Sequence, residues 1–136
     1  MKTTHSNKSD LVLINTPNLN GTNTIRLGLL TIASFIRKHG FKVIILDGTI
    51  RSIKNQIVNL PLDNTIVGLT ATTDVVLIAY DLCKFIKKHF PAAYCILGGF
   101  HATALPEDTL RESDFDMVVF GEGELTVLDI LNAYRN

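Results

Sequence analysis

Five short apolar segments recur along the chain, and each is almost continuous in hydrophobicity instead of alternating with polar residues. Strands that helices cover on both faces of a parallel sheet have this pattern, whereas half-exposed strands alternate. The sequence therefore predicts five buried strands. They span residues 11–15, 42–46, 66–70, 94–97 and 117–120.

Amphipathic stretches with the signals of helix ends lie between these segments. The first covers residues 27–39 and has Leu30 among the apolar side chains of its packing face. Gly40 follows it and can adopt the left-handed backbone angles that end a helix. Thr72 or Thr73 is suited to cap the third helix. The remaining helices are expected over residues 50–59, 74–89, 105–112 and 124–134.

The alternation of strands and helices with short connections determines the expected fold class. Right-handed crossovers predict an α/β protein, with a Rossmann-like or flavodoxin-like doubly wound sheet of five parallel strands in the order 2-1-3-4-5. A chain of 136 residues suits one domain. We expect that domain over residues 10–136, after a disordered N-terminal tail over residues 1–9.

Composition and charge narrow the range of partners. The chain is 46% hydrophobic and 19% charged, as compact globular domains are. Its 13 basic and 13 acidic residues cancel, which argues against binding to nucleic acid. No apolar run approaches the roughly 20 residues that span a bilayer, and the polar N-terminus lacks the apolar core of a signal peptide. We therefore expect a cytoplasmic location.

The two cysteines, Cys83 and Cys95, have neither CxxC spacing nor clustered histidine partners. This argues against a disulfide framework, a zinc site or an iron–sulfur cluster in this chain. We expect no metal-ligating residues, and we expect both thiols to be buried as small apolar groups.

Four loops that follow predicted strands are rich in glycine, threonine and asparagine. In a doubly wound sheet, ligands bind outside the carboxyl ends of the strands. Glycine lets a ligand approach the backbone, and hydroxyl and amide groups offer neutral hydrogen bonds. The candidate binding residues are Pro17, Asn18, Thr70, Ala71, Thr72, Thr73, Gly98, Gly99, His101, Thr103, Gly121, Glu122 and Gly123.

These loops hold no P-loop, GxGxxG element or nucleophile elbow, so we expect no catalytic residues. Several alternatives remain open. Gly98 and Gly99 can serve only to permit a tight turn. His101 can bind a metal or shuttle a proton, or simply hydrogen-bond the backbone. Glu122 and Glu124 can form a carboxylate pair, or begin the last helix, where negative charge is favourable.

Two longer runs resemble a known domain family. Residues 97–107 read LGGFHATALPE and residues 115–124 read FDMVVFGEGE. Together with the segment Gly28-Leu29-Leu30 and the IVGLT run at residues 66–70, they resemble the cobalamin-binding domain at the N-terminus of class B radical SAM proteins. The resemblance extends over about residues 11–134, and the GGxHAT and GEGE elements are its most specific parts.

The resemblance implies a Rossmann-like module that binds cobalamin (vitamin B12), with the corrin at the carboxyl edge of the sheet and the nucleotide tail between the loops. Residues 70–73 and the Gly98-Gly99 pair would line the tail. Residues 17–20, 101–103 and 121–124 would complete the rim.

Two departures from the family pattern are informative. The DxHxxG segment that supplies a histidine to cobalt is absent, since residues 15–20 read NTPNLN. The family's members are expected to continue into a radical SAM barrel with a CxxxCxxC cluster motif, and residues 1–136 contain no such motif. A smaller departure is Arg26, which stands where relatives often carry proline.

The leading hypothesis is a non-catalytic module that holds or presents a corrinoid, with a separate radical SAM methyltransferase as its partner. A second hypothesis is an interaction or regulatory domain that kept the fold and lost the ligand. A third is a small flavodoxin-like enzyme in which His101 and Glu122 act as acid and base. The sequence leaves the oligomeric state open.

Overall fold

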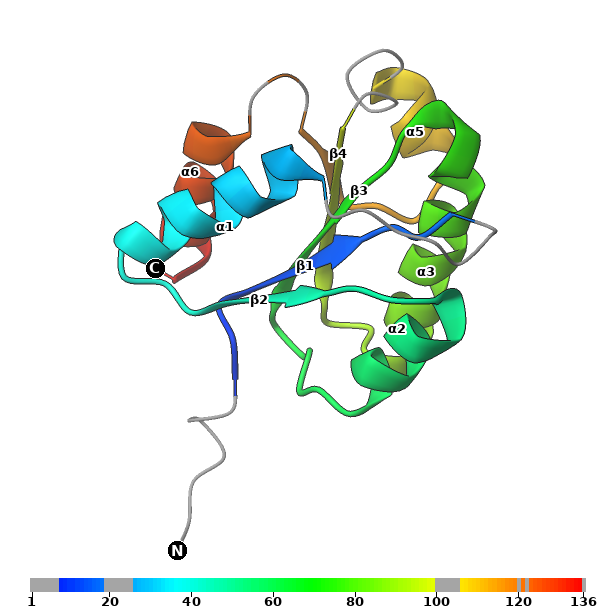
Figure 1. Ribbon diagram of the computed structural model, residues 1–136, viewed down its shortest axis with the longest axis horizontal. Helices are drawn as coiled ribbons and strands as arrows, with labels where there is room; N and C mark the ends of the chain where they lie inside the picture. Colours follow the sequence, from blue (N-terminus) through cyan, green and yellow to red (C-terminus); the bar gives the residue numbers. More distant parts are fainter. Residues whose placement is uncertain (1–7, 19–25, 100–105, 120, 122, 136) are drawn as a thin grey trace, which may run out of the picture.

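Five parallel strands form one sheet in the order β2-β1-β3-β4-β5 (Figure 1). The computed structural model describes residues 8–18, 26–99, 106–119, 121 and 123–135. The order confirms the predicted doubly wound α/β fold. The strands are β1 (Leu11–Asn15), β2 (Val43–Leu46), β3 (Ile66–Thr70), β4 (Tyr94–Gly98) and β5 (Met117–Val118).

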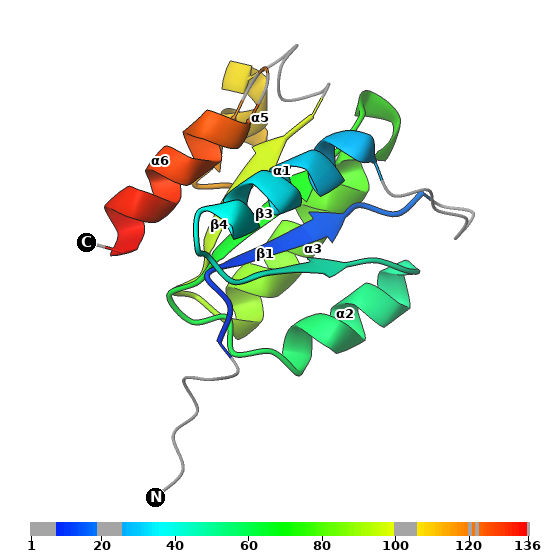
Figure 2. The same cartoon turned by 60° about the vertical axis from the view of Figure 1, so that its left-hand side comes forward.

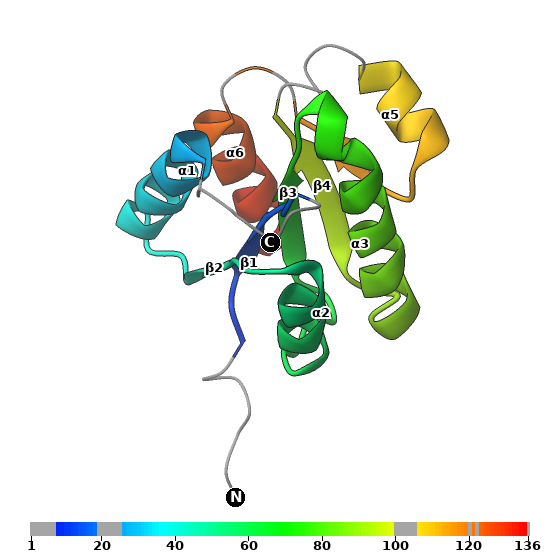
Figure 3. The ribbon, with the colours of Figure 1, turned by 45° about the vertical axis from the view of Figure 1, so that its right-hand side comes forward.

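Helices cover both faces of the sheet. On one face, α1 (Leu27–Lys38) and α6 (Glu124–Arg135) lie side by side (Figure 2). On the other face lie α2 (Ile50–Val58) and α3 (Val76–His89), with α5 (Pro106–Glu112) beyond α3 (Figure 3). No helix in the described part of the chain is long and apolar enough to cross a membrane.

Side chains from both faces of the central strands are buried, which explains the continuous apolar runs of the sequence. Val12 and Ile14 of β1 belong to the core under α2 and α3, whereas Leu11 and Leu13 belong to the core under α1 and α6. Alternate residues of a strand point to opposite faces, so a strand covered on both sides is apolar throughout.

The two cysteines are free thiols and completely buried, as predicted. A hydrogen bond to Cys95 and burial raise the pKa of the Cys83 thiol far above its usual value. Cys83 is therefore a protonated core side chain.

Some helix boundaries and faces differ from the predictions. Leu30 is 41% exposed, because the residues of α1 that face the sheet are Leu29, Ala33 and Ile36, and Leu30 lies about 100° around the helix from Leu29. A short 3-10 helix, η2 (Thr73–Val75), precedes α3. Thr72 stands at its N-cap, but its hydroxyl donates to the Asp74 carboxylate and makes no capping bond.

The ends of the domain are described in part. Of the predicted tail over residues 1–9, residues 1–7 lie outside the described residues. Ser9 is buried two residues before β1. The last strand is described over Met117–Val118. Phe120, its predicted end, lies outside the described residues.

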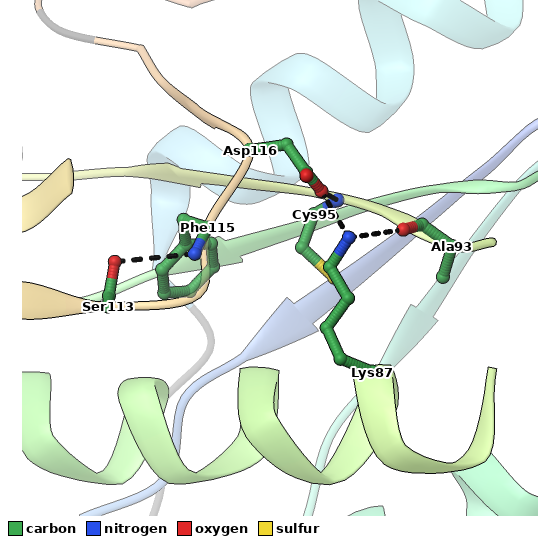
Figure 4. A network of polar contacts seen from close by, with 6 residues as sticks. All are labelled: Lys87, Ala93, Cys95, Ser113, Phe115 and Asp116. Atoms are coloured by element: carbon green, nitrogen blue, oxygen red, sulfur yellow. Dashed lines mark hydrogen bonds and ion pairs between the residues drawn. The ribbon is translucent and has the colours of Figure 1, made fainter. Parts of the chain in front are cut away.

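The short strand β5 is joined to β4 by a polar network around Asp116 (Figure 4). The Asp116 carboxylate accepts hydrogen bonds from the Cys95 backbone N–H at 2.8 Å and from Lys87 Nζ at 2.5 Å. Lys87 Nζ also donates to the Ala93 carbonyl at 2.7 Å. The Asp116 side chain thus replaces a backbone partner at the start of an edge strand that is only two residues long.

Burial of Lys87 by itself lowers the pKa of its ammonium group, but the hydrogen bond to Asp116 and the charge of Asp116 outweigh burial and raise it above 10.5. A lysine whose pKa is raised on folding stabilises the fold at every pH below its unfolded pKa. This contribution requires the ionised Asp116 carboxylate, and on the alkaline side it is lost as the pH rises through the folded pKa of Lys87.

We expect Asp116→Ala to lower the free energy of unfolding by about 1–2 kcal/mol, because it leaves the buried Cys95 N–H without an acceptor. Urea denaturation at neutral pH measures this. Asp81→Ala is the matched control, since it breaks the more exposed Lys54–Asp81 ion pair and should cost less than about 0.5 kcal/mol. Equal losses for the two variants would contradict the role assigned to Asp116.

Candidate functional site

A groove of about 820 Å³ extends from the carboxyl ends of β3 and β4 into the space between the sheet and helices α1 and α6. Its floor is a row of three residues that are neighbours across the central strands. Leu13 of β1 is paired with Gly68 of β3, and Gly68 with Ile96 of β4. The first turns of α1 and α6 form the walls.

Gly68 makes this floor hollow. A Cβ atom at this position would lie 3.0 Å from Leu13 Cδ2 and 3.6 Å from Ile96 Cγ1. Any side chain there would therefore press on its neighbours and fill the groove. A glycine inside a strand weakens the strand, and it often marks a place where a ligand approaches the backbone.

The Gly98-Gly99 pair has two different roles. Gly99 has a φ angle of +100°, and a Cβ there would lie 2.7 Å from Thr70 Oγ1 and 2.8 Å from the Ala71 carbonyl oxygen. Backbone geometry alone therefore requires glycine at position 99. A Cβ at Gly98 would make only an ordinary contact, at 3.6 Å from the Val119 carbonyl oxygen, so Gly98 leaves free space in the groove that it lines.

Arg26 brings a positive charge to the groove at the start of α1. Its Nη1 donates to Asn15 Oδ1 at 2.8 Å and to the Thr16 carbonyl oxygen at 3.1 Å. Asn15 in turn donates from Nδ2 to Asp47 Oδ1 at 3.1 Å. This network ties the ends of β1 and β2 to the first turn of α1.

The loop after β1 contains two buried polar atoms that receive no hydrogen bond from the described residues. Thr16 is completely buried, and neither Thr16 Oγ1 nor Asn18 Oδ1 has a hydrogen-bond partner in the described part of the chain. Buried polar atoms are nearly always hydrogen-bonded in folded proteins. Such atoms beside the carboxyl edge of the sheet are consistent with a polar ligand.

The structure brings most of the predicted site residues together around the groove. Those that line it are Thr70, Ala71, Thr72, Gly98, Gly99, Gly121 and Gly123. Pro17, Asn18 and Thr73 are not part of its lining; Pro17 is buried and Thr73 is exposed in η2. His101, Thr103 and Glu122 lie outside the described residues. That any of these residues binds a ligand stays a prediction.

The sequence analysis found Thr70 and Gly98 at the ends of β3 and β4, but it missed the groove residues in the strand interiors and in the helices. Gly68 carried a signal, because glycine is uncommon within a buried strand. Gly28 in the first turn of α1 also lines the groove, and a Cβ there would meet nothing within 4 Å. Among the described residues, no three histidine, cysteine or acidic side chains are grouped so that they could hold a metal ion.

The sequence matches the family model of the B12 binding domain over residues 20–131. The chain belongs to this family. The resemblance stated from the GGxHAT and GEGE elements is thereby confirmed.

Curated relatives of this B12-binding domain are much longer proteins. The uncharacterized methyltransferase PH0819 of Pyrococcus horikoshii is 38% identical over 118 residues, which are 83% of this chain and 25% of that protein. The anaerobic magnesium-protoporphyrin IX monomethyl ester cyclase of Cereibacter sphaeroides is 35% identical over 71 residues, which are 52% of this chain and 12% of that protein. The chain thus spans a quarter or less of these relatives.

A solved structure shares the fold. The cobalamin-dependent S-adenosylmethionine radical enzyme OxsB, determined with aqua-cobalamin bound, superposes with a TM-score of 0.74 at 21% sequence identity. The match covers 96% of this chain and 19% of OxsB. The chain therefore shares the fold of one part of OxsB.

The two kinds of glycine at the groove should respond oppositely to alanine. Gly99→Ala should lower the free energy of unfolding by at least about 2 kcal/mol, because of its positive φ and the backbone atoms around its Cβ. Gly28→Ala, on a helix and facing open space, should raise it by about 0.5 kcal/mol. Thermal and urea unfolding measure both. A neutral Gly99→Ala would show that the turn adapts.

Proposed function

We propose that this chain holds cobalamin in the groove between the sheet and helices α1 and α6, and presents it to a radical SAM methyltransferase. The observation that carries the proposal is the hollow floor at Gly68 in a domain of the B12-binding family. A packed domain of this size has no structural need for a groove of about 820 Å³.

The chemistry of the groove suits a corrinoid. The nucleotide tail of cobalamin ends in a flat aromatic base, and Leu13 and Ile96 offer an apolar floor on either side of Gly68. Thr70 and Thr72 supply hydroxyl groups near the carboxyl edge, and Gly98 leaves its backbone accessible. A mostly apolar cleft with a few polar groups is the usual form of a cofactor site.

When bound, cobalamin supplies a cobalt centre for group transfer, and the protein contributes binding and orientation. Arg26 and Glu124 are the only ionisable side chains among the described residues that line the groove. The chain's own residues therefore exclude water and hold the cofactor by packing and hydrogen bonds. They position it, and the described residues that line the groove include no acid–base pair for the reaction.

The surface around the groove supports the proposal that the chain presents cobalamin to a radical SAM methyltransferase. Leu77 and Leu125, in the first turns of α3 and α6, are 74% and 68% exposed. Helices in this fold begin at the carboxyl edge of the sheet, so both leucines flank the cofactor edge. Leucines this exposed beside the site offer apolar contacts to another protein, and a radical SAM barrel is the partner whose chemistry uses a corrinoid.

Incubation with hydroxocobalamin followed by desalting tests whether the chain binds cobalamin. We expect the protein fraction to keep a corrinoid absorption spectrum and the melting temperature to rise, since a ligand that binds only the folded state stabilises it. A protein fraction that is colourless, with an unchanged melting temperature, would refute cobalamin binding.

A groove-filling variant locates the site. Gly28→Phe projects a large side chain from α1 beside open groove space, and we expect it to fold normally and to lose most of its corrinoid. Ser34→Phe is the matched control, because it adds the same side chain at an exposed position of α1 that does not line the groove. Equal retention of cobalamin by both variants would place the corrinoid elsewhere.

The partner is tested with a radical SAM protein of the same genome that has no corrinoid-binding domain of its own. We expect it to co-elute in gel filtration with the cobalamin-loaded chain, and Leu77→Glu with Leu125→Glu to abolish co-elution without loss of corrinoid. Val58→Glu is the control, since Val58 is 42% exposed at the far end of α2. Co-elution that survives the two leucine changes would contradict this surface.

A further inference from the structure

Arg26 lines the groove, and the described residues use only part of its hydrogen-bonding capacity. Nη1 carries two N–H groups and donates to two oxygens, Asn15 Oδ1 and the carbonyl oxygen of Thr16. The Nε and Nη2 groups make no hydrogen bond with the described residues. Since Nε and Nη2 share one edge of the guanidinium plane, that edge is a pair of parallel donors without an acceptor in the described part of the chain.

The guanidinium group is held in position before any ligand arrives. Asn15 is completely buried, and Asp47 accepts a hydrogen bond from its amide nitrogen, which leaves the amide oxygen directed to Arg26. The backbone of Thr16 supplies the second acceptor. A donor group fixed in this way loses little side-chain entropy when it binds a ligand.

The charge of Arg26 is distinctive within the groove. Among the described residues that line it, Arg26 is the single cation, and Glu124, on the wall formed by α6, is the single acid. The paired donors of an arginine edge match two oxygens of a phosphate group. Cobalamin carries one phosphodiester, in the nucleotide tail between the corrin side chain and the base, whereas cobinamide lacks this tail.

We propose that Arg26 binds the phosphodiester of the nucleotide tail, and that it thereby makes the groove selective for corrinoids that carry this phosphate. The inference rests on the proposed function, because it requires a corrinoid in the groove. It adds a specificity residue that acts on the tail, separate from the apolar floor that receives the base.

The test compares three corrinoids by titration calorimetry. Cobalamin has phosphate and base, cobinamide phosphate has the phosphate alone, and cobinamide has neither. We expect Arg26→Gln to weaken the binding of cobalamin and of cobinamide phosphate by about tenfold or more, which is the effect of one charge-assisted contact. The affinity for cobinamide should change by less than about twofold. Arg26→Lys, which keeps the charge but not the paired donors, should fall between.

Two controls separate this role from a structural one. Arg51→Gln removes an exposed arginine of α2 that does not line the groove, and it should leave the binding of all three corrinoids unchanged. Circular dichroism and the melting temperature show whether each variant is folded, and the cobinamide affinity shows whether its groove is intact. The affinity of each Arg26 variant for a corrinoid is compared with the affinity of the natural chain for the same corrinoid. Any conformational change of the corrinoid on binding then contributes equally to both values and cancels.

The possible failures are distinguishable. If Arg26→Gln weakens cobinamide as much as cobalamin, Arg26 shapes the groove and the phosphate contact is wrong. If Arg26→Gln lowers the affinity for none of the three corrinoids, Arg26 has no part in binding. If the natural chain binds no corrinoid at all, the proposed function fails and this inference fails with it.

Discussion

The register between β1, β3 and β4 is the constraint on which the groove depends. It sets Leu13, Gly68 and Ile96 in one row on the face that α1 and α6 cover. A shift of β3 by one residue would bring Val67 or Leu69 to that face, because alternate residues of a strand point to opposite sides. The space would then be filled. The groove is thus a property of the whole central sheet, although a single missing side chain creates it.

The edge of the sheet supports the groove from the other end. Three contacts hold the segment from Asp116 to Val119 against β4. The Asp116 carboxylate accepts from the Cys95 N–H, the two residues of β5 pair with β4, and the Val119 N–H donates to the Leu97 carbonyl oxygen. Val119, Gly121 and Gly123 follow directly and line the groove on the side of α6. Gly123 also lets α6 approach α1, since a Cβ there would lie 3.3 Å from Ile32 Cδ1. A polar network remote from the groove therefore sets the position of one of its walls.

The sequence was sufficient for the fold and for part of the site. Continuous apolar segments indicate burial on both faces, and this local signal predicted the strands. The alternation of strands and helices, with right-handed crossovers, predicted their order. The rule that ligands bind at the carboxyl ends of strands found the loops and the strand ends Thr70 and Gly98, but it does not consider strand interiors or helices. Gly28 and Leu13 line the groove because α1 packs over the sheet at a particular angle, which depends on contacts far apart in the chain. For the same reason, Leu30 was assigned to the wrong face of its helix.

Arg26 shows why a charged residue of the site is harder to predict than an apolar one. An isolated arginine before a helix has no distinctive pattern, and its significance depends on Asn15, a completely buried amide at the end of a strand. Such an amide is costly unless both of its ends are hydrogen-bonded. Asp47 and Arg26 satisfy one end each. The two oxygens that hold Arg26 are neutral, so the arginine is fixed in place without a contact ion pair among the described residues. Its positive charge therefore remains available to a ligand in the groove.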